Sequence, residues 1–294
     1  MFRKAIEKVG NFTRPIHFIS NIYGEKTVMP GAATLFFVND EGYAITCKHV
    51  TTIIKQATGI HHNYTQFQQE RNLLQKSSSY NKKIKDLKTR YGFDKNENTC
   101  QLLYQFVDCV DLQSVDILEH PVYDLAILKM KDFTKSFYKG HAVFAKNTTD
   151  VQPGFFLCRL GYPFPEFTNF TYDEKSENIS FTGAAVRTVR FPIEGMMTRH
   201  FGDAEGNIFG IEMSTPGLKG QSGGPLFDAE GIIYGMQSMT HHLHLGFDMN
   251  NHEIYSEGRR IKVNNQPLLH VGHCVHVDII KLFLKENHVA FEEA

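Results

Sequence analysis

The sequence predicts an all-β fold of two antiparallel barrels, interrupted by one helical insertion and closed by a C-terminal helix. Short apolar runs, of the length typical of strands, recur through most of the chain and are separated by glycine-containing turns. Residues 55–98 replace these runs with Gln, Lys, Asn and Ser, while residues 277–284 carry apolar side chains at helical spacing. Many short strands with turn signals between them are typical of barrels.

Size and composition limit the kinds of protein this can be. The 294 residues leave room for one large or two small domains, and a net charge of −1 gives no electrostatic reason to expect a nucleic-acid partner. No run approaches the roughly 18 apolar residues of a membrane span. The first ten residues lack the apolar run of a signal peptide, and the five cysteines show no framework spacing. We therefore expect a cytoplasmic protein with no membrane partner.

The first barrel is expected over residues 31–145, after an N-terminal arm of residues 1–30. Its opening hairpin turns at Asn39-Asp40-Glu41-Gly42, and the returning strand leads directly to His49. A histidine at the end of a strand is commonly a core or rim residue, and this chain has 15 of them. Only the residues that flank His49 therefore support it as a candidate functional residue.

Residues 55–98 predict a charged, partly helical insertion on the surface of the first barrel. Ile84, Leu87 and Tyr91 recur there at helical spacing. The insertion could act as a lid or could dock a regulatory protein, although a solvated excursion without a function is the more common case.

Asp124 stands directly before the apolar run of residues 125–128. A carboxylate next to a buried strand is costly unless a polar group pairs with it, and a histidine N–H would do so. The alternative is that Asp124 only caps the start of the strand.

The second barrel and the C-terminal helix are expected over residues 146–294, and they contain Gly220-Gln221-Ser222-Gly223-Gly224-Pro225-Leu226. Glycine permits backbone angles closed to other residues, so several N–H groups can converge beside one hydroxyl. Acyl transfer needs a nucleophile and such donors for the oxyanion. The alternative is a glycine-rich turn with an ordinary serine.

The same stretch fits the nucleophile elbow of α/β-hydrolases, which places the serine between a strand and a helix. Here residues 214–219 suggest a loop before Ser222, and residues 225–234 suggest a strand, a turn and another strand after it. This arrangement favours an all-β hydrolase.

Three separate segments resemble the catalytic signatures of chymotrypsin-fold (trypsin-like) serine proteases, and they follow one another in the same order as in that family. They are Thr46-Cys47-Lys48-His49-Val50, Asp124-Leu125-Ala126-Ile127-Leu128 and the glycine-rich stretch around Ser222. The flanking residues 37–46 and 151–163 resemble the bacterial Do/DegP-type branch. The resemblance covers roughly residues 30–240 outside the insertion, and it implies two six-stranded Greek-key barrels. The chain after Ser222 is expected to complete the barrel and the helix, without the PDZ domain common in that branch.

The resemblance implies a serine endopeptidase that forms an acyl-enzyme with a polypeptide substrate. His49 would be the general base and then the acid, Asp124 would hold its tautomer, and Ser222 would attack the carbonyl. The N–H groups of Gly220 and Ser222 would form the oxyanion hole. The residues expected to pair with the substrate backbone, as an added strand, are Ser238, Met239 and Thr240.

Two positions depart from the pattern of the family. Gln221 stands where zymogen-activated members have the aspartate that binds a newly cut N-terminus, so we expect activity without propeptide cleavage. Pro216 lies near the position of the specificity carboxylate of trypsins, and no acidic residue is close to it in the sequence. A preference for Lys or Arg before the scissile bond is therefore not expected.

Other candidates are weaker. A polar stretch holds five potential metal ligands without a spacing typical of a metal site, and we expect a surface loop there: His241, His242, His244, Asp248 and His252. Cys47 is expected to point away from His49 and to pack rather than act as a redox switch. No metal or other cofactor is therefore expected. One alternative class stays open, a protease-fold binding or scaffold module that is latent until a partner arranges the oxyanion loop.

Overall fold

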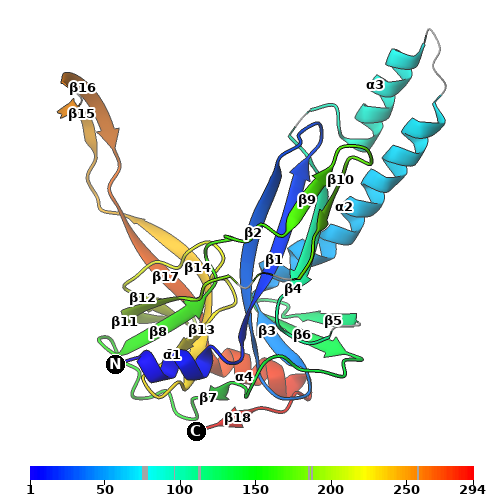
Figure 1. Ribbon diagram of the computed structural model, residues 1–294. Helices are drawn as coiled ribbons and strands as arrows, with labels where there is room; N and C mark the ends of the chain where they lie inside the picture. The colour runs from blue at the N-terminus through cyan, green and yellow to red at the C-terminus, as the bar shows by residue number, and fades with distance from the viewer. Residues whose placement is uncertain (75–78, 96, 112–113, 185, 187, 257) are drawn as a thin grey trace.

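The computed structural model describes residues 1–294 except 75–78, 96, 112–113, 185, 187 and 257. Two mainly antiparallel sheets form the body, and two arms project from the same side of it, one helical and one a β-hairpin (Figure 1). The predicted all-β architecture with a helical insertion and a C-terminal helix is confirmed. None of the described helices is both long enough and apolar enough to cross a bilayer.

The first sheet has six strands in the order β4-β1-β2-β3-β6-β5. These strands are β1 (Thr13–Ile22), β2 (Val28–Phe37), β3 (Tyr43–Thr46), β4 (Thr99–Phe106), β5 (Ser114–Glu119) and β6 (Ala126–Lys131). Residues 1–30, expected as an arm, supply the helix α1 (Arg3–Val9) and strand β1, which pairs with both β2 and β4. Both faces of β1 are covered, because Ile16 lies in the core and His17 stacks on Phe167. Its sequence therefore lacks the alternation that marks a half-exposed strand.

The second sheet closes into a six-stranded barrel, because β13 pairs with both β8 and β14. The barrel strands are β8 (Phe156–Gly161), β11 (Phe191–Gly202), β12 (Ile208–Met213), β13 (Pro225–Phe227), β14 (Ile233–His244) and β17 (Leu268–His276). Two short strands, β7 (Val143–Phe144) and β18 (Glu292–Glu293), extend the sheet beside β14. One apolar cluster joins Leu35 and Leu128 of the first sheet to Leu160 of the barrel and to Ile280 of the closing helix α4 (Val277–Glu286). The two sheets are thus packed into one body.

The helical arm consists of α2 (Lys48–Leu73) and α3 (Tyr80–Tyr91). The insertion was expected over residues 55–98, of which 75–78 and 96 lie outside the described residues, but the helix begins earlier, directly after β3. Phe67 and Leu87 share a buried aromatic cluster with Tyr23 of the body, so the arm packs on the first sheet. Arg71 also pairs with Glu177 at 2.7 Å, between the short strands β9 (Phe170–Asp173) and β10 (Asn178–Phe181).

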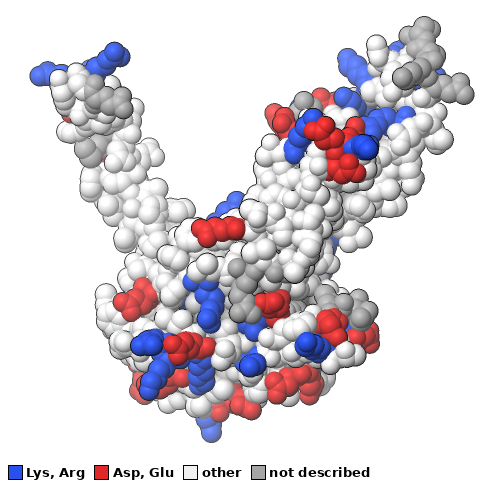
Figure 2. Space-filling view, viewed as in Figure 1, with Lys and Arg blue, Asp and Glu red and all other residues white. Residues whose placement is uncertain are grey.

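The second arm is a hairpin of β15 (Met249–Ser256) and β16 (Arg259–Asn265), which continues from β14 and β17. Residues 241–252, expected to form a surface loop, are therefore mostly strand, although nearly all the described side chains there are exposed. Polar residues on both faces of an exposed ribbon give no apolar alternation, so the pattern does not signal a strand. On the face shown in Figure 2, acidic and basic side chains intermix over the body and the helical arm.

Candidate active site

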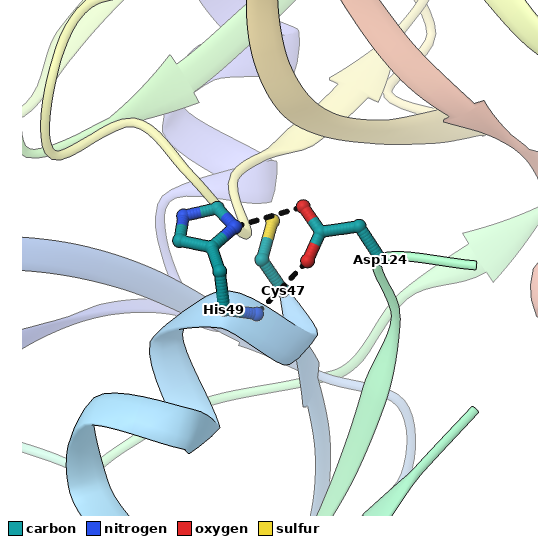
Figure 3. A group of neighbouring side chains, drawn as sticks. All are labelled: Cys47, His49 and Asp124. Carbon is teal, nitrogen blue, oxygen red and sulfur yellow. Dashed lines mark hydrogen bonds and ion pairs between the residues drawn. The ribbon is translucent and has the colours of Figure 1, made fainter. Parts of the chain in front are cut away.

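His49 lies in the first turn of α2, immediately after the end of β3. Backbone N–H groups in the first turn of a helix have no acceptor within the helix. Asp124 supplies one, because its Oδ1 accepts from the His49 backbone N–H at 2.9 Å while its Oδ2 lies 2.8 Å from His49 Nδ1 (Figure 3). One carboxylate thus caps the helix and fixes the orientation of the imidazole that the helix carries.

Asp124 is held as a carboxylate by its hydrogen bonds. Burial by itself would raise the pKa of Asp124, but donation from the His49 ring, the Ser238 hydroxyl and the His49 backbone N–H outweighs it and lowers the pKa to about 2. The positive end of the α2 dipole acts in the same direction. Asp124 is therefore ionised at neutral pH, and the His49 nitrogen that faces it carries the proton.

The loop that carries Ser222 is fixed by contacts with the first sheet. Thr34 of β2 donates from its N–H to the Ser222 carbonyl at 3.0 Å and from its Oγ1 to the Gly220 carbonyl at 2.8 Å. Gln221 is fully buried, accepts from the Leu218 N–H at 3.0 Å and donates to the Phe191 carbonyl at 3.0 Å. A neutral amide therefore braces this loop from within the chain.

Gly220 has a positive φ of 100°, and a Cβ there would lie 2.6 Å from the Tyr162 carbonyl oxygen. Only glycine fits this position. The N–H groups of Gly223 and Gly224 donate to Gln237 and Gln221 carbonyls at 2.9 and 2.8 Å. Within the described chain, the N–H groups of Gly220 and Ser222 donate to no acceptor. The two donors expected to form an oxyanion hole are thus not engaged with other groups of this part of the chain.

Ser238 connects Ser222 to the His49–Asp124 pair. Its hydroxyl donates to Asp124 Oδ2 at 2.6 Å, and its carbonyl accepts from Ser222 Oγ at 3.3 Å. No hydrogen bond between Ser222 and His49 occurs among the residues described. The structure therefore brings the three predicted catalytic residues into one hydrogen-bonded group through Ser238.

A pocket of about 430 Å³ opens beside Ser222. The three residues expected to bind the substrate backbone line it, together with the loop that precedes Ser222: Pro216, Gly217, Ser238, Met239 and Thr240. Met239 is 54% exposed and also borders a second pocket of about 250 Å³, on the side of Asp124. Tyr123 and Phe209, whose rings stack at 5.5 Å, form part of its wall. Ser238 and Met239 thus line both pockets, whereas Thr240 lines only the larger one.

Cys47 lies closer to His49 than its sequence context predicts. Its Sγ, the His49 ring and the Asp124 carboxylate offer ligand atoms within 4.8 Å of one another, so the expectation that Cys47 points away is wrong (Figure 3). Such a donor set fits zinc. However, the thiol is fully buried and donates to the Gln237 carbonyl at 3.2 Å, and burial, with a smaller effect of Asp124, raises its pKa well above the usual range. Cys47 is a packed, protonated thiol.

The histidine-rich stretch of β14 and β15 does not form a comparable group. Within the described residues, His244 pairs with Asp248 at 2.8 Å, and no third ligand joins them. His252 lies further along the exposed hairpin, in β15.

Residues 33–236 match the family of the trypsin-like peptidase domain. The chain belongs to this family. The predicted family and its chymotrypsin-like fold are therefore confirmed. A search of curated proteins found no match to the sequence.

Two solved structures similar to this trypsin-like peptidase chain are of the HtrA-type protease AlgW, one with a tripeptide and one with a decapeptide. The first has 12% identity and a TM-score of 0.46, and the match covers 97% of this chain and 63% of the chain in that structure. The second has 11% identity and a TM-score of 0.48, and the match covers 98% of this chain and 68% of the chain in that structure. This chain thus spans less than two thirds of the length of the first structure.

The sequence does not predict two features of the site, namely the contact of Ser238 with Asp124 and the presence of Arg159. The Ser238 side chain was expected only to lie near the substrate backbone, and no local pattern indicates its bond to Asp124. Arg159 is fully buried in β8 behind the larger pocket, and it donates to Gln237 Oε1 and to the Thr215 and Pro216 carbonyls. A single charged residue within the apolar run of residues 155–160 was the available signal.

Proposed function

We propose that the chain is a serine endopeptidase that hydrolyses peptide bonds through an acyl-enzyme, with His49, Asp124 and Ser222 as its triad. The observation that carries the proposal is the pair of bonds made by Ser238, which link the Ser222 hydroxyl to the carboxylate that orients His49. Hydrogen bonds between catalytic residues are often long before substrate binds and shorten in the complex.

In the first half of the reaction, Ser222 Oγ attacks the scissile carbonyl carbon and His49 Nε2 takes its proton. Asp124 holds the other ring nitrogen at 2.8 Å and stabilises the imidazolium that forms. The oxyanion of the tetrahedral intermediate accepts from the N–H groups of Gly220 and Ser222. The carbon–nitrogen bond then breaks, His49 gives its proton to the leaving amine, and an ester joins the substrate to Ser222.

In the second half, a water molecule attacks the ester carbonyl while His49 takes its proton. The bond to Ser222 Oγ breaks, and His49 returns the proton to that oxygen. The products are a carboxylic acid and the free enzyme, so no cofactor is needed to balance the reaction.

A fluorophosphonate probe tests this proposal, because it reacts with an activated serine. The wild type should label and should cleave a fluorescently labelled protein substrate, whereas Ser222→Ala should lose both by roughly 10³-fold or more. Ser176→Ala, at an exposed serine near β9, is the matched control and should behave as the wild type. Equal labelling of wild type and Ser222→Ala would exclude Ser222 as the nucleophile.

A second candidate is a protease-fold binding or scaffold module that stays latent until a partner arranges the site. One observation favours it, since the Ser222 hydroxyl donates to Ser238 rather than to His49. The helical arm gives a partner a route to the site, because α2 carries His49 in its first turn. No labelling of a folded wild type, checked by circular dichroism, would support this second candidate.

A further inference from the structure

The larger pocket beside Ser222 lies above a buried, unpaired cation. The Arg159 guanidinium is fully buried, and no carboxylate lies within ion-pair distance of it among the described residues. Its partners are neutral oxygens, namely the Gln237 side chain at 2.5 Å, the Thr215 hydroxyl at 2.6 Å, and the Thr215 and Pro216 carbonyls at 2.9 and 3.1 Å. Its Nε is buried without a partner. Burying a charge without a counter-ion is costly, so the fold maintains a positive charge here at the expense of stability.

This charge is next to the pocket, because two of the three residues that Arg159 contacts also form the pocket wall. Gln237 and Pro216 both line it. The trans peptide plane places the Gly217 N–H opposite the Pro216 carbonyl, so this N–H points away from the guanidinium. Gly217 lines the pocket, and its N–H donates to no acceptor in the described chain. The wall therefore offers a backbone donor that is polarised by the cation behind it.

The other ionisable residues that line the pocket are Lys219, His242 and His270, and no carboxylate is among the lining residues. Lys219 is exposed. His242 and His270 face each other across β14 and β17, and their Nδ1 atoms lie 2.5 Å apart. One ring must accept this bond, and an accepting ring carries its proton on Nε2. The rim thus presents an ammonium group and at least one imidazole N–H.

We propose that this pocket binds an acidic side chain, Glu or Asp, on the residue that precedes the scissile bond of the substrate (P1). The proposal rests on the proposed function, because it assigns a specificity to the same site. Size does not decide between side chains, since about 430 Å³ accepts any of them. Charge does distinguish between side chains. A carboxylate would accept hydrogen bonds from the Gly217 N–H and the rim donors, and it would provide the counter-charge that Arg159 lacks. A P1 lysine or arginine would meet the same positive field.

The test is a set of peptide substrates that differ only at P1, with Glu, Asp, Gln, Leu or Lys. We expect kcat/KM for Glu or Asp to exceed that for Gln by at least 10-fold and that for Lys by a larger factor. Lys219→Glu should reduce the ratio of Glu to Gln by at least 3-fold. Lys175→Glu, which changes the charge equally on the β9–β10 turn, should leave the ratio unchanged. Equal or higher kcat/KM for Gln, Leu or Lys would overturn the proposal.

The same comparison can be made without turnover, which separates this inference from the proposed function. The Ser222→Ala variant is mixed with labelled peptides that end in a P1 Glu, Gln or Lys, and binding is measured by fluorescence anisotropy. Tighter binding of Glu than of Gln by at least 10-fold supports the acidic pocket even if the chain is latent. Equal binding, or a preference for Lys, overturns it, whatever the fluorophosphonate result. Arg159→Gln removes the buried charge but can also disturb folding, so Lys219→Glu is the deciding variant.

Discussion

The Ser238 hydroxyl donates to Asp124 Oδ2 at 2.6 Å, and the same carboxylate oxygen lies 2.8 Å from the His49 ring. Two donors therefore converge on one oxygen, while the other oxygen accepts from the His49 backbone. Hydrogen bonds to charged groups contribute about 1.5–3 kcal/mol each, so the loss of one should be measurable.

Ser238→Ala should lower kcat/KM by roughly 10-fold or more, because the carboxylate loses a donor and holds the imidazole less firmly. Ser238→Thr keeps a hydroxyl and should recover most of the loss. The backbone carbonyl that accepts from Ser222 remains in both variants. Activity of Ser238→Ala equal to that of the wild type would show that this bond does not position the pair.

Gly220→Ala should lower kcat by roughly 10²–10³-fold, the range typical of removing an oxyanion donor. The residue has φ of 100° and no space for a Cβ beside the Tyr162 carbonyl, so alanine must shift the loop and its N–H. Gly154→Ala is the matched control, since Gly154 has φ of 98° but open space around it. The control should lose about 1–2 kcal/mol of stability, because an L-residue is strained at positive φ, and keep its kcat. A similar kcat for both variants would argue against an oxyanion role.

The sequence could predict His49, Asp124 and Ser222 because each lies in a short segment whose local pattern is sufficient. Each motif combines a strand end or tight turn with one polar residue, and both features depend on neighbours in the chain. The Ser238–Asp124 bond joins residues from different sheets, so no local pattern contains it. The same holds for Arg159, whose partners Thr215, Pro216 and Gln237 follow much later in the chain.

Parts of the fold were not predictable for a related reason. Strand β1 is covered on both faces, so it lacks alternation, and Arg14 and His17 within it find partners only in the folded chain. The exposed ribbon of β15 and β16 lacks alternation because neither face is covered. The helix start at Lys48 was missed because Asp124, distant in sequence, supplies the cap.

All five cysteines are free and buried, so the folded chain should show no rapidly reacting thiol. Burial raises the pKa of Cys158 and of Cys274 to about 12, which leaves almost no thiolate at neutral pH. Titration with a thiol reagent should detect five thiols in denaturant and none within minutes in native buffer. Rapid modification of Cys47 in the native chain, with loss of activity, would instead indicate a redox switch beside His49.

His17 makes the stability of the fold sensitive to acid. Its ring stacks on Phe167 with centroids 3.9 Å apart, Nε2 lies 3.2 Å from Thr188 Oγ1, and Nδ1 is buried without a partner. Burial, opposed by a smaller effect of Asp108, lowers the pKa of His17 to about 4. With this lower pKa in the folded chain, protonation of His17 favours the unfolded chain. The contribution of His17 to stability is therefore constant above about pH 6.5 and falls as the pH drops toward 4. The loss should be about 1.5 kcal/mol between pH 6.5 and 5.

His17→Phe keeps an aromatic ring against Phe167 but cannot take a proton, so it isolates this effect. Burial also lowers the pKa of His276 to about 4, and that contribution stays in the variant. Urea unfolding at pH 7.5, 6.5, 5.5 and 5.0 should therefore show a smaller loss of stability for His17→Phe than for the wild type. The variant should be less stable than the wild type at pH 7.5, because Thr188 loses its partner. His61→Phe, at an exposed histidine of the helical arm, should keep the pH dependence of the wild type. Identical curves for the wild type and His17→Phe would show that His17 does not gain its proton on unfolding in this pH range.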